Sequence, residues 1–238
     1  MSTTLADWFA TPTGRYLLAR EQAWFDRTVA DIFGFRAVQI GLPEFPFLAQ
    51  SRIAARWTLD YNAPADIHAD PHWLPIAENA LDLVVLPHAL EFTSDPHRLL
   101  REVHRAVRPE GQVVLAGFNP FSLYGAKRYF GQGETPPWDG NFIALYRVKD
   151  WLALLGFEVT GGGLDAYAPP FAQDKWLRRS AFMERAGDRW WPIAGGVYFL
   201  RATKKVIGMR VITPAWQQRR SALAAAPRQA RECIERVE

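Results

Sequence analysis

Three residues that can bind or activate a ligand stand where short apolar segments of this sequence end. Gly41 closes one such segment, Asp60 follows the next, and His88 lies just past the apolar run 81–86. A glycine lets a ligand approach the backbone, a carboxylate accepts hydrogen bonds, and a neutral imidazole accepts or orients a proton. If the segments are neighbouring parallel strands, their carboxyl ends meet at one edge, where open α/β sheets bind ligands. The sequence therefore predicts a ligand site at that edge.

The elements that must position these residues are clearest in the middle of the chain. Residues 81–86 are too short for a lone helix and rich in β-branched side chains, which predicts a buried strand. Asp95 or Ser94 can cap a helix that Pro96 opens, and apolar residues then recur at helical spacing. A second strand over 112–118 follows. Strand, amphipathic helix and strand together predict a crossover between parallel strands.

The same patterns predict further elements along the chain. We expect helices over 13–33, 47–56 and 147–156, strands over 35–41, 57–59 and 196–203, and a strand that begins near Gly156. The segment 119–139 is predicted to be a long loop whose aromatic residues line or cover a substrate cleft.

Five short motifs around this strand–helix–strand unit follow the order of a known family. They are an acid, a Leu-Pro pair, an apolar strand with an acid, a His-x-Leu-Glu segment and a basic-Pro-x-Gly turn, found here as Asp70, Leu74-Pro75, Leu81–Val85, His88–Glu91 and Arg108–Gly111. The chain resembles the type 11 group of class I S-adenosylmethionine-dependent methyltransferases over about residues 35–205. The resemblance implies an α/β fold with a Rossmann-like, mostly parallel sheet, helices on both faces and an antiparallel last strand. It also implies methyl transfer from S-adenosyl-L-methionine to a small-molecule acceptor, without a metal.

By the same resemblance, residues at the ends of the strands hold the cofactor. Asp60 corresponds to the acid that holds the ribose hydroxyls, and Asp70 to the acid that accepts a hydrogen bond from the adenine amino group. The implied cofactor-binding set is Gly41, Leu42, Asp60, Asp70, Pro71 and Pro87. His88 is the candidate catalytic residue, placed to contact the methyl-transfer site.

Each of these side chains also has a plain structural explanation. Asp60 precedes Tyr-Asn-Ala-Pro and can form a turn, and Asp70 can cap a turn before Pro71. A lone histidine such as His88 is commonly a satisfied structural residue, and Glu91 is a weaker catalytic candidate.

The glycine-rich turn of the family is altered in this chain. Gln39 stands in place of its acid, and Pro43 and Phe45 in place of its second and third glycines. Proline removes a backbone donor and the positive φ that such a turn uses. This departure leaves an alternative open, a catalytically inactive methyltransferase-like binding or scaffold protein. The two hypotheses differ in whether Asp60 and Asp70 converge on one hollow or whether Pro43 and Phe45 fill it.

Size and composition are those of a folded globular protein. The 238 residues predict one methyltransferase-like domain over 1–213, with a helical cover over 1–34 and a basic tail over 214–238. The single cysteine excludes an internal disulfide, and no window predicts a signal peptide or a membrane span. We therefore expect a cytoplasmic protein. Nucleic-acid binding through the basic C-terminal region is possible but not favoured at a net charge of +3, and the sequence does not indicate an oligomeric state.

Overall fold

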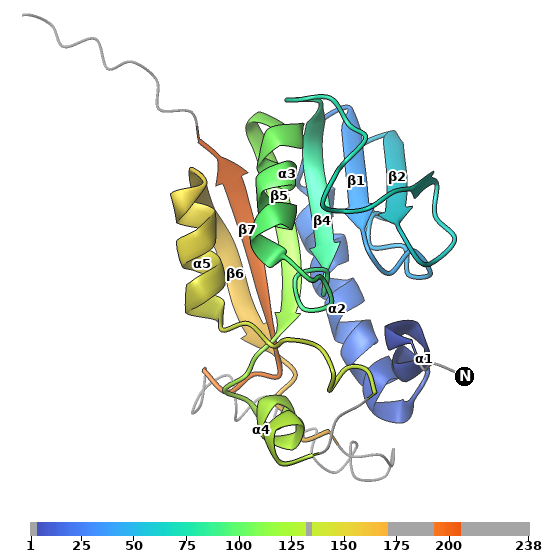
Figure 1. The fold of residues 1–238 in the computed structure, drawn as a ribbon, viewed down its shortest axis with the longest axis vertical. Coiled ribbons are helices and arrows are strands. Elements are labelled where there is room, and N and C mark those ends of the chain that lie inside the picture. The colour runs from blue at the N-terminus through green and yellow to red at the C-terminus, as the bar shows by residue number, and fades with distance from the viewer. Residues whose placement is uncertain (1–3, 132–134, 171–192, 206–238) are drawn as a thin grey trace, which may run out of the picture. The chain divides into compact units, whose positions relative to one another are not determined.

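A seven-stranded sheet forms the centre of the computed structural model, which describes residues 4–131, 135–170 and 193–205. The strands lie in the order β3-β2-β1-β4-β5-β7-β6, and Figure 1 shows this order from β2 to β6. Their bounds are β1 Arg36–Ile40, β2 Ala55–Asp60, β3 Ile67–His68, β4 Leu81–Pro87, β5 Val107–Phe118, β6 Phe157–Asp165 and β7 Val197–Lys204. β1 to β5 pair in parallel, whereas β7 is antiparallel to both of its neighbours. The predicted mostly parallel sheet with an antiparallel last strand is confirmed.

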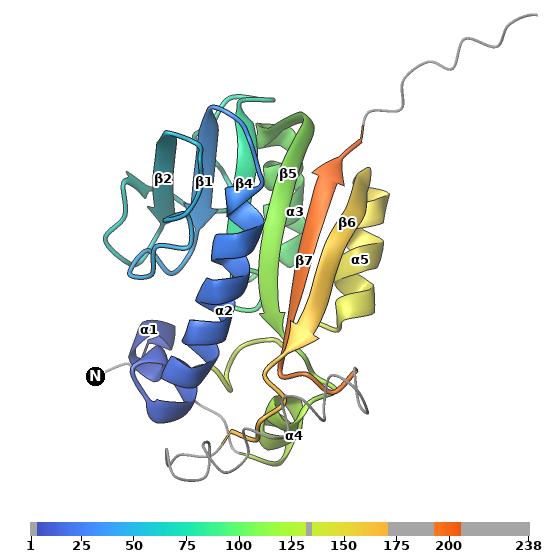
Figure 2. The same cartoon turned by 180° about the vertical axis from the view of Figure 1, so that it is seen from behind.

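Helices cover both faces of the sheet, as predicted. α2 (Pro12–Ala30) lies on one face, and α3 (Pro96–Ala106) and α5 (Leu145–Leu154) lie on the other (Figures 1 and 2). Two shorter helices, α1 (Leu5–Phe9) and α4 (Leu123–Phe130), lie near the carboxyl ends of the strands. None of the helices in the described part of the chain is long and apolar enough to cross a membrane.

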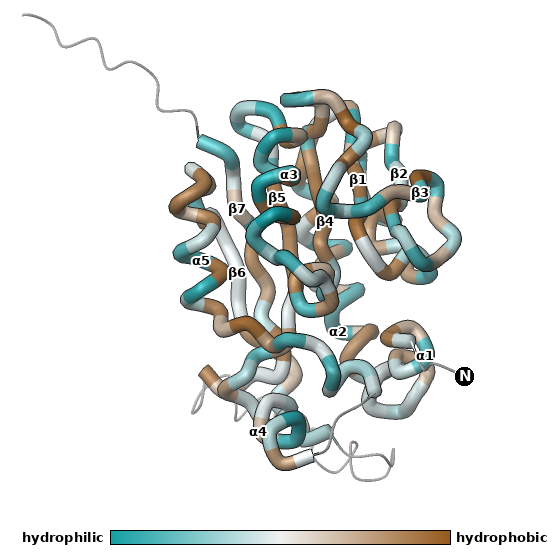
Figure 3. The backbone as a smooth tube through the Cα atoms, viewed as in Figure 1, coloured by the Kyte–Doolittle hydropathy of each residue, from teal (hydrophilic) through white to brown (hydrophobic). Residues whose placement is uncertain are grey.

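β4 joins the two halves of the core. All seven of its residues are buried, and the side chains of residues 83–86 alternate between two hydrophobic clusters. Val84 and Leu86 pack in the cluster beneath α3 and α5, and Leu83 and Val85 in the cluster beneath α2. Burial on both faces explains the continuous apolar run in the sequence, and Figure 3 shows the hydrophobic strands β1, β4 and β5 inside a more hydrophilic cover.

The start of α3 agrees with its sequence signals, but the strand after it begins earlier than predicted. The Asp95 side chain accepts a hydrogen bond from the backbone N–H of Arg98 at 2.9 Å, and Pro96 is the first helical residue. β5 already begins at Val107, because Val107 pairs with Leu81 before residues 108–111 bulge out of register. The basic-Pro-x-Gly turn is therefore a bulge within the strand.

Two predictions about the connections are wrong. Residues 47–54 form turns and bends, and β2 begins at Ala55, so no helix lies between β1 and β2. The segment 119–139 contains the helix α4, whose first turn is capped by Ser122 through the N–H of Gly125 at 3.2 Å. The predicted domain boundary at residue 213 and the tail 214–238 lie outside the described residues.

The side chain of Gln39 forms hydrogen bonds with the backbone of the turns that follow β1. Its Nε2 donates to the backbone oxygens of Gly41, Leu42 and Phe45 at 3.1, 2.9 and 2.9 Å. Its Oε1 accepts a hydrogen bond from the N–H of Phe47 at 3.1 Å. Only 1% of Gln39 is exposed, so these bonds satisfy the polar atoms of a side chain that water does not reach.

We therefore expect the protein to be less stable with a carboxylate at position 39 than with an amide. Gln39→Glu replaces a donor that faces three carbonyl oxygens with a charged oxygen, and we expect the free energy of unfolding to fall by about 3 kcal/mol at pH 8. Protonation restores one donor, so the deficit shrinks as the pH falls toward 5. Urea unfolding at both pH values measures it. Gln112→Glu is the matched control, because Oε1 of Gln112 only accepts a hydrogen bond, from Arg201 at 2.7 Å; an equal loss there would contradict the explanation.

Candidate active site

Two adjoining cavities open at the carboxyl ends of β1, β2 and β4. Their volumes are about 440 and 290 Å³. They share five lining residues: Gly41, Asp60, Asn62, Ala89 and Phe92. This is the edge of the sheet at which the sequence predicts a ligand site.

The first cavity brings together four of the sequence-predicted cofactor residues. Gly41, Asp60, Asp70 and Pro71 all line it. Oδ1 of Asp60 accepts hydrogen bonds from the backbone N–H groups of Asn62 and Ala63 at 2.7 and 2.9 Å. Asp60 therefore forms the predicted turn and also lines the cavity.

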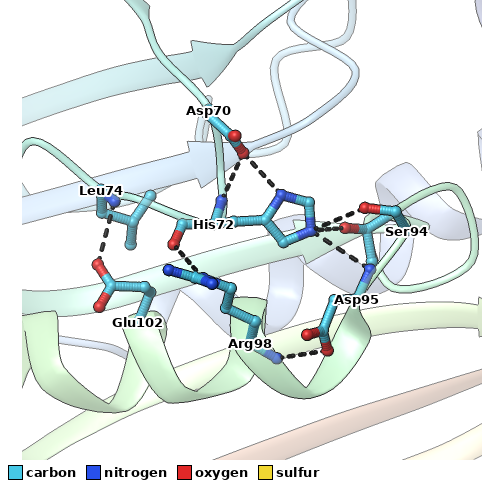
Figure 4. A network of polar contacts seen from close by, with 8 residues as sticks. Asp70, His72, Leu74, Ser94, Asp95, Arg98 and Glu102 are labelled. Carbon is cyan, nitrogen blue, oxygen red and sulfur yellow. Dashed lines mark hydrogen bonds and ion pairs between the residues drawn. The ribbon is translucent and has the colours of Figure 1, made fainter.

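Asp70 is held in place by His72. Oδ1 of Asp70 lies 2.8 Å from the backbone nitrogen and 2.7 Å from Nδ1 of His72 (Figure 4). The other ring nitrogen, Nε2, accepts from the backbone N–H of Asp95 at 3.3 Å and lies 2.7 Å from the Thr93 hydroxyl. A nitrogen that accepts carries no proton, so Nδ1 carries it and donates to Asp70. The N–H of His72 is the main cause that lowers the pKa of Asp70 below its ordinary 3.8, which keeps this carboxylate ionised.

The segment after Asp70 is tied to helix α3. Nε of Arg98 donates to the backbone oxygen of His72 at 3.3 Å, and its guanidinium lies 3.6 Å from the centroid of the Trp73 ring. Glu102 accepts from the N–H of Leu74 at 3.1 Å (Figure 4). The cavity wall at Asp70 is thus fixed by a regular element rather than by the loop alone.

The second cavity holds the remaining predicted cofactor residues. Leu42 and Pro87 line it, together with Gly41 and Asp60. Gly41 and Leu42 both have positive φ angles, 88° and 49°, so the chain turns sharply at the end of β1 despite the altered glycine motif. Across the cavity, Thr4, Leu5 and Ala6 at the start of α1 form part of the wall.

Pro43 and Phe45 do not fill the first cavity. Neither residue lines it, and Pro43 lies in the wall of the second. The Phe45 ring packs against Phe9 of α1 with centroids 5.4 Å apart. The residues that replace the family's glycines therefore leave room beside Asp60 and Asp70.

His88 differs from the sequence-based expectation of an imidazole open to substrate. Its side chain has no exposed surface, and its ring nitrogens lie 2.8 Å from Oε1 of Glu21 and 2.7 Å from Oε2 of Glu91. The cause is helix α2, which brings Glu21 onto the imidazole. The catalytic role stays a prediction, but in this structure the residue lines the second cavity while its imidazole lies buried between two carboxylates.

The two carboxylates set the charge of this imidazole. Burial by itself lowers the pKa of His88, but Glu21 and Glu91 outweigh it and raise the pKa from 6.5 to about 10. Burial also raises the pKa of Glu91 above 4.5. A protonated His88 donates from both nitrogens, which matches its two carboxylate partners. Across the described ranges, no group of three or more His, Cys, Asp or Glu side chains is arranged to hold a metal ion.

Part of this chain is similar to a known family of proteins. Residues 47–115, which are 69 of the 238 residues, match the family model of a methyltransferase domain. The match covers the strands and the helix from β2 to β5 and agrees with the resemblance to the type 11 group of class I methyltransferases. Among solved structures, a SAM-dependent methyltransferase of Thermotoga maritima, described as a possible histamine N-methyltransferase, has a TM-score of 0.57 to this chain at 16% identity. The likeness covers 80% of this chain and 93% of that one and shows a shared fold.

Relatives by sequence cover less of the chain. The uncharacterized protein YafS of Escherichia coli strain K12 is 34% identical over 160 residues, 64% of this chain and 65% of that protein. A malonyl-[acyl-carrier protein] O-methyltransferase of Laribacter hongkongensis is 32% identical over 95 residues, 40% of this chain and 32% of that protein. The chain spans less than two thirds of the length of these relatives.

Sequence reasoning missed three residues that shape the site: Glu21, Gln39 and His72. Glu21 had a recognisable signal, because it stands four residues from both Leu17 and Phe25 in an otherwise apolar and buried stripe of α2. Gln39 is a polar residue within a predicted buried strand. His72 gave no comparable signal, because two of its partners, Thr93 and Asp95, come from a segment more than twenty residues away.

Proposed function

We propose that this chain is an S-adenosyl-L-methionine-dependent methyltransferase that acts on a small-molecule acceptor in the cytoplasm. The observation that carries the proposal is the first cavity, where Gly41, Asp60 and Asp70 from the ends of three different strands line one hollow of about 440 Å³. A cavity of this size suits a small molecule or cofactor. Similarity to SAM-dependent methyltransferases supports S-adenosyl-L-methionine as the cofactor.

The carboxylates of the site suit a ligand with hydroxyl and amino groups. Asp60 and Asp70 each use Oδ1 to hold their own turn, and the second oxygen of each makes no hydrogen bond to a described residue. Asp60 would accept from the ribose hydroxyls and Asp70 from the adenine amino group, with Pro71 beside the ring. Gly41, Leu42 and Pro87 would surround the methionine end.

Gly41 suits the cofactor because a side chain there would enter the cleft. A Cβ at this position would lie 3.7 Å from the carbonyl oxygen of Pro87 and 3.8 Å from Cβ of Ala89, on the opposite wall. When bound, S-adenosyl-L-methionine supplies a methyl group activated by a sulfonium leaving group. The task of the protein is then to position cofactor and acceptor, and the apolar walls of the second cavity suit the acceptor.

No observation favours the inactive scaffold over the enzyme. The hollow stays open beside both acids, and neither Pro43 nor Phe45 lines it. Nucleic-acid binding would depend on the basic tail, residues 214–238, which lies outside the described residues. Nucleic-acid binding is therefore not part of the proposal, and neither is an oligomeric state.

Calorimetric titration with S-adenosyl-L-methionine tests the proposal. We expect binding by the wild-type chain and a loss of about tenfold or more in Asp60→Asn. Asparagine keeps the oxygen that holds the turn but loses the charge-assisted hydrogen bonds, worth about 1.5–3 kcal/mol. Asp66→Asn is the matched control, because Asp66 holds the N–H of Thr58 at 2.8 Å but lines neither cavity.

Two results would count against the proposal in different ways. A wild-type chain that binds no cofactor at millimolar concentration refutes the methyltransferase function. Equal losses in Asp60→Asn and Asp66→Asn would show that the cofactor binds elsewhere.

A further inference from the structure

Glu21 is a buried acid with no part in the cofactor contacts proposed above. It lies on α2, outside residues 47–115 that match the family model. Its side chain has no exposed surface, and Oε1 lies 2.8 Å from Nε2 of His88. Its other oxygen, Oε2, has no hydrogen-bond partner among the described residues. Burying a carboxylate in this way is costly, which calls for a compensating role.

The backbone at His88 forms a wall of the cleft. Pro87 and His88 line the second cavity, and Ala89 lines both. His88 has a φ of 53°, a left-handed conformation that a non-glycine residue adopts only when its surroundings hold it there. The turn faces Gly41, since Pro87 and Ala89 are the residues that a Cβ on Gly41 would meet.

The imidazole also supports the opposite wall of the second cavity. The ring of Phe9, at the end of α1, lies 5.9 Å from the His88 ring between centroids. The start of the same short helix contributes Thr4, Leu5 and Ala6 to that cavity. One buried side chain therefore contacts both the turn after β4 and the helix that faces it.

We propose that Glu21 is a positioning residue that fixes both walls of the cleft by holding the His88 imidazole between itself and Glu91. We call the arrangement of Glu21, His88 and Glu91 the clamp. Glu91 anchors it to the sheet, because its Oε1 accepts a hydrogen bond from the backbone N–H of Phe118 at the end of β5. The clamp is an inference from the fold, and only its effect on the cofactor rests on the proposed function.

The titratable and charged groups around the clamp determine the pH range over which His88 stays protonated. Glu21 comes from α2 and Glu91 from the turn after β4, and the buried hydroxyls of Tyr124 on α4 and Tyr198 on β7 face the same carboxylates. Arg20, the cation nearest in sequence to Glu21, is paired with Asp165 on β6. With both carboxylates present, His88 keeps its proton throughout the neutral range; removing the charge of Glu21 lowers the pKa of His88, so the clamp weakens as the pH rises.

Amide hydrogen exchange tests the clamp without any cofactor. In Glu21→Gln, whose side chain has nearly the same shape, we expect the amides of residues 88–92 to exchange about tenfold faster at pH 8, in the range typical of coupling between linked sites. Asp165→Asn is the control, because it weakens a different polar contact of α2 with the sheet, that between Arg20 and Asp165, and leaves the clamp intact. Equal exchange in the two variants would overturn the proposal.

A pH series with S-adenosylhomocysteine, the product form of the cofactor, gives the second measurement. The dissociation constant of Glu21→Gln, divided by that of Asp165→Asn at the same pH, should rise about tenfold between pH 6 and pH 9. A ratio that does not change with pH would show that Glu21 only adds stability. If the wild type binds no S-adenosylhomocysteine, the proposed function fails, and hydrogen exchange still decides on the clamp.

Discussion

Replacing His88 with leucine is expected to lower the free energy of unfolding by about 3–5 kcal/mol at pH 7, which is the usual cost of removing one partner from a buried charged group. The imidazole is surrounded by two carboxylates with no exposed surface, at 2.8 and 2.7 Å. Without it, Glu21 and Glu91 keep their buried positions but lose the cation between them. Urea unfolding followed by tryptophan fluorescence measures the loss.

Two further variants separate this effect from a general loss of packing. Adding Glu21→Gln to His88→Leu removes one of the two uncompensated charges, so the double variant should be more stable than the sum of the single losses predicts. His97→Leu, at an exposed position on α3, should change stability by about 0.5 kcal/mol or less. A loss below about 1 kcal/mol in His88→Leu would contradict a charged network at this position.

The same network makes the stability of the wild type depend on pH. The folded pKa of His88, about 10, lies above its ordinary 6.5. The stability that this group contributes is therefore fully present below pH 6.5 and is lost as the pH rises through 10. The raised pKa of Glu91 acts in the same direction, because its folded form also binds a proton more tightly than the unfolded chain. We expect unfolding midpoints in urea to fall from pH 6.5 to pH 10, and a wild type that gains stability over this range would refute the assignment.

The parts of the fold that the sequence predicted well are those with local causes. β4, the capped start of α3 and the antiparallel β7 each follow from an apolar run, a cap or a family pattern. The convergence of Asp60 and Asp70 on one hollow follows in the same way, since it depends on the ends of parallel strands.

The parts that were not predicted depend on single side chains that act over long distances in the sequence. Residues 47–54 form turns and bends instead of the predicted helix, and the amide of Gln39 binds the backbone of Leu42, Phe45 and Phe47 where these turns begin. The burial of His88 depends on Glu21, 67 positions earlier, and no local pattern connects the two residues. Sequence patterns therefore predicted the edge of the sheet at which the cavities open, but not the burial of His88.

The altered glycine turn gives the second large expected effect. Gly41→Val should abolish detectable binding of S-adenosyl-L-methionine, and Gly41→Ala should weaken it by about a hundredfold, roughly 2.7 kcal/mol. Two causes combine here. Gly41 has a φ of 88°, which an L side chain rarely adopts, and its Cβ would point between Pro87 and Ala89 into the cleft.

The chain offers a control that separates these two causes. Gly156, which follows α5, has a φ of 83°, and a Cβ there would have its nearest neighbour at 3.7 Å, as at Gly41, but that neighbour is the backbone oxygen of Lys205. Gly156→Ala should therefore cost about the same stability as Gly41→Ala, about 1 kcal/mol, while leaving cofactor affinity unchanged. Thermal unfolding and calorimetric titration of both variants make the comparison. Unchanged affinity in Gly41→Ala would mean that the turn after β1 does not contact the cofactor. The cofactor site would then have to lie elsewhere along the edge of the sheet.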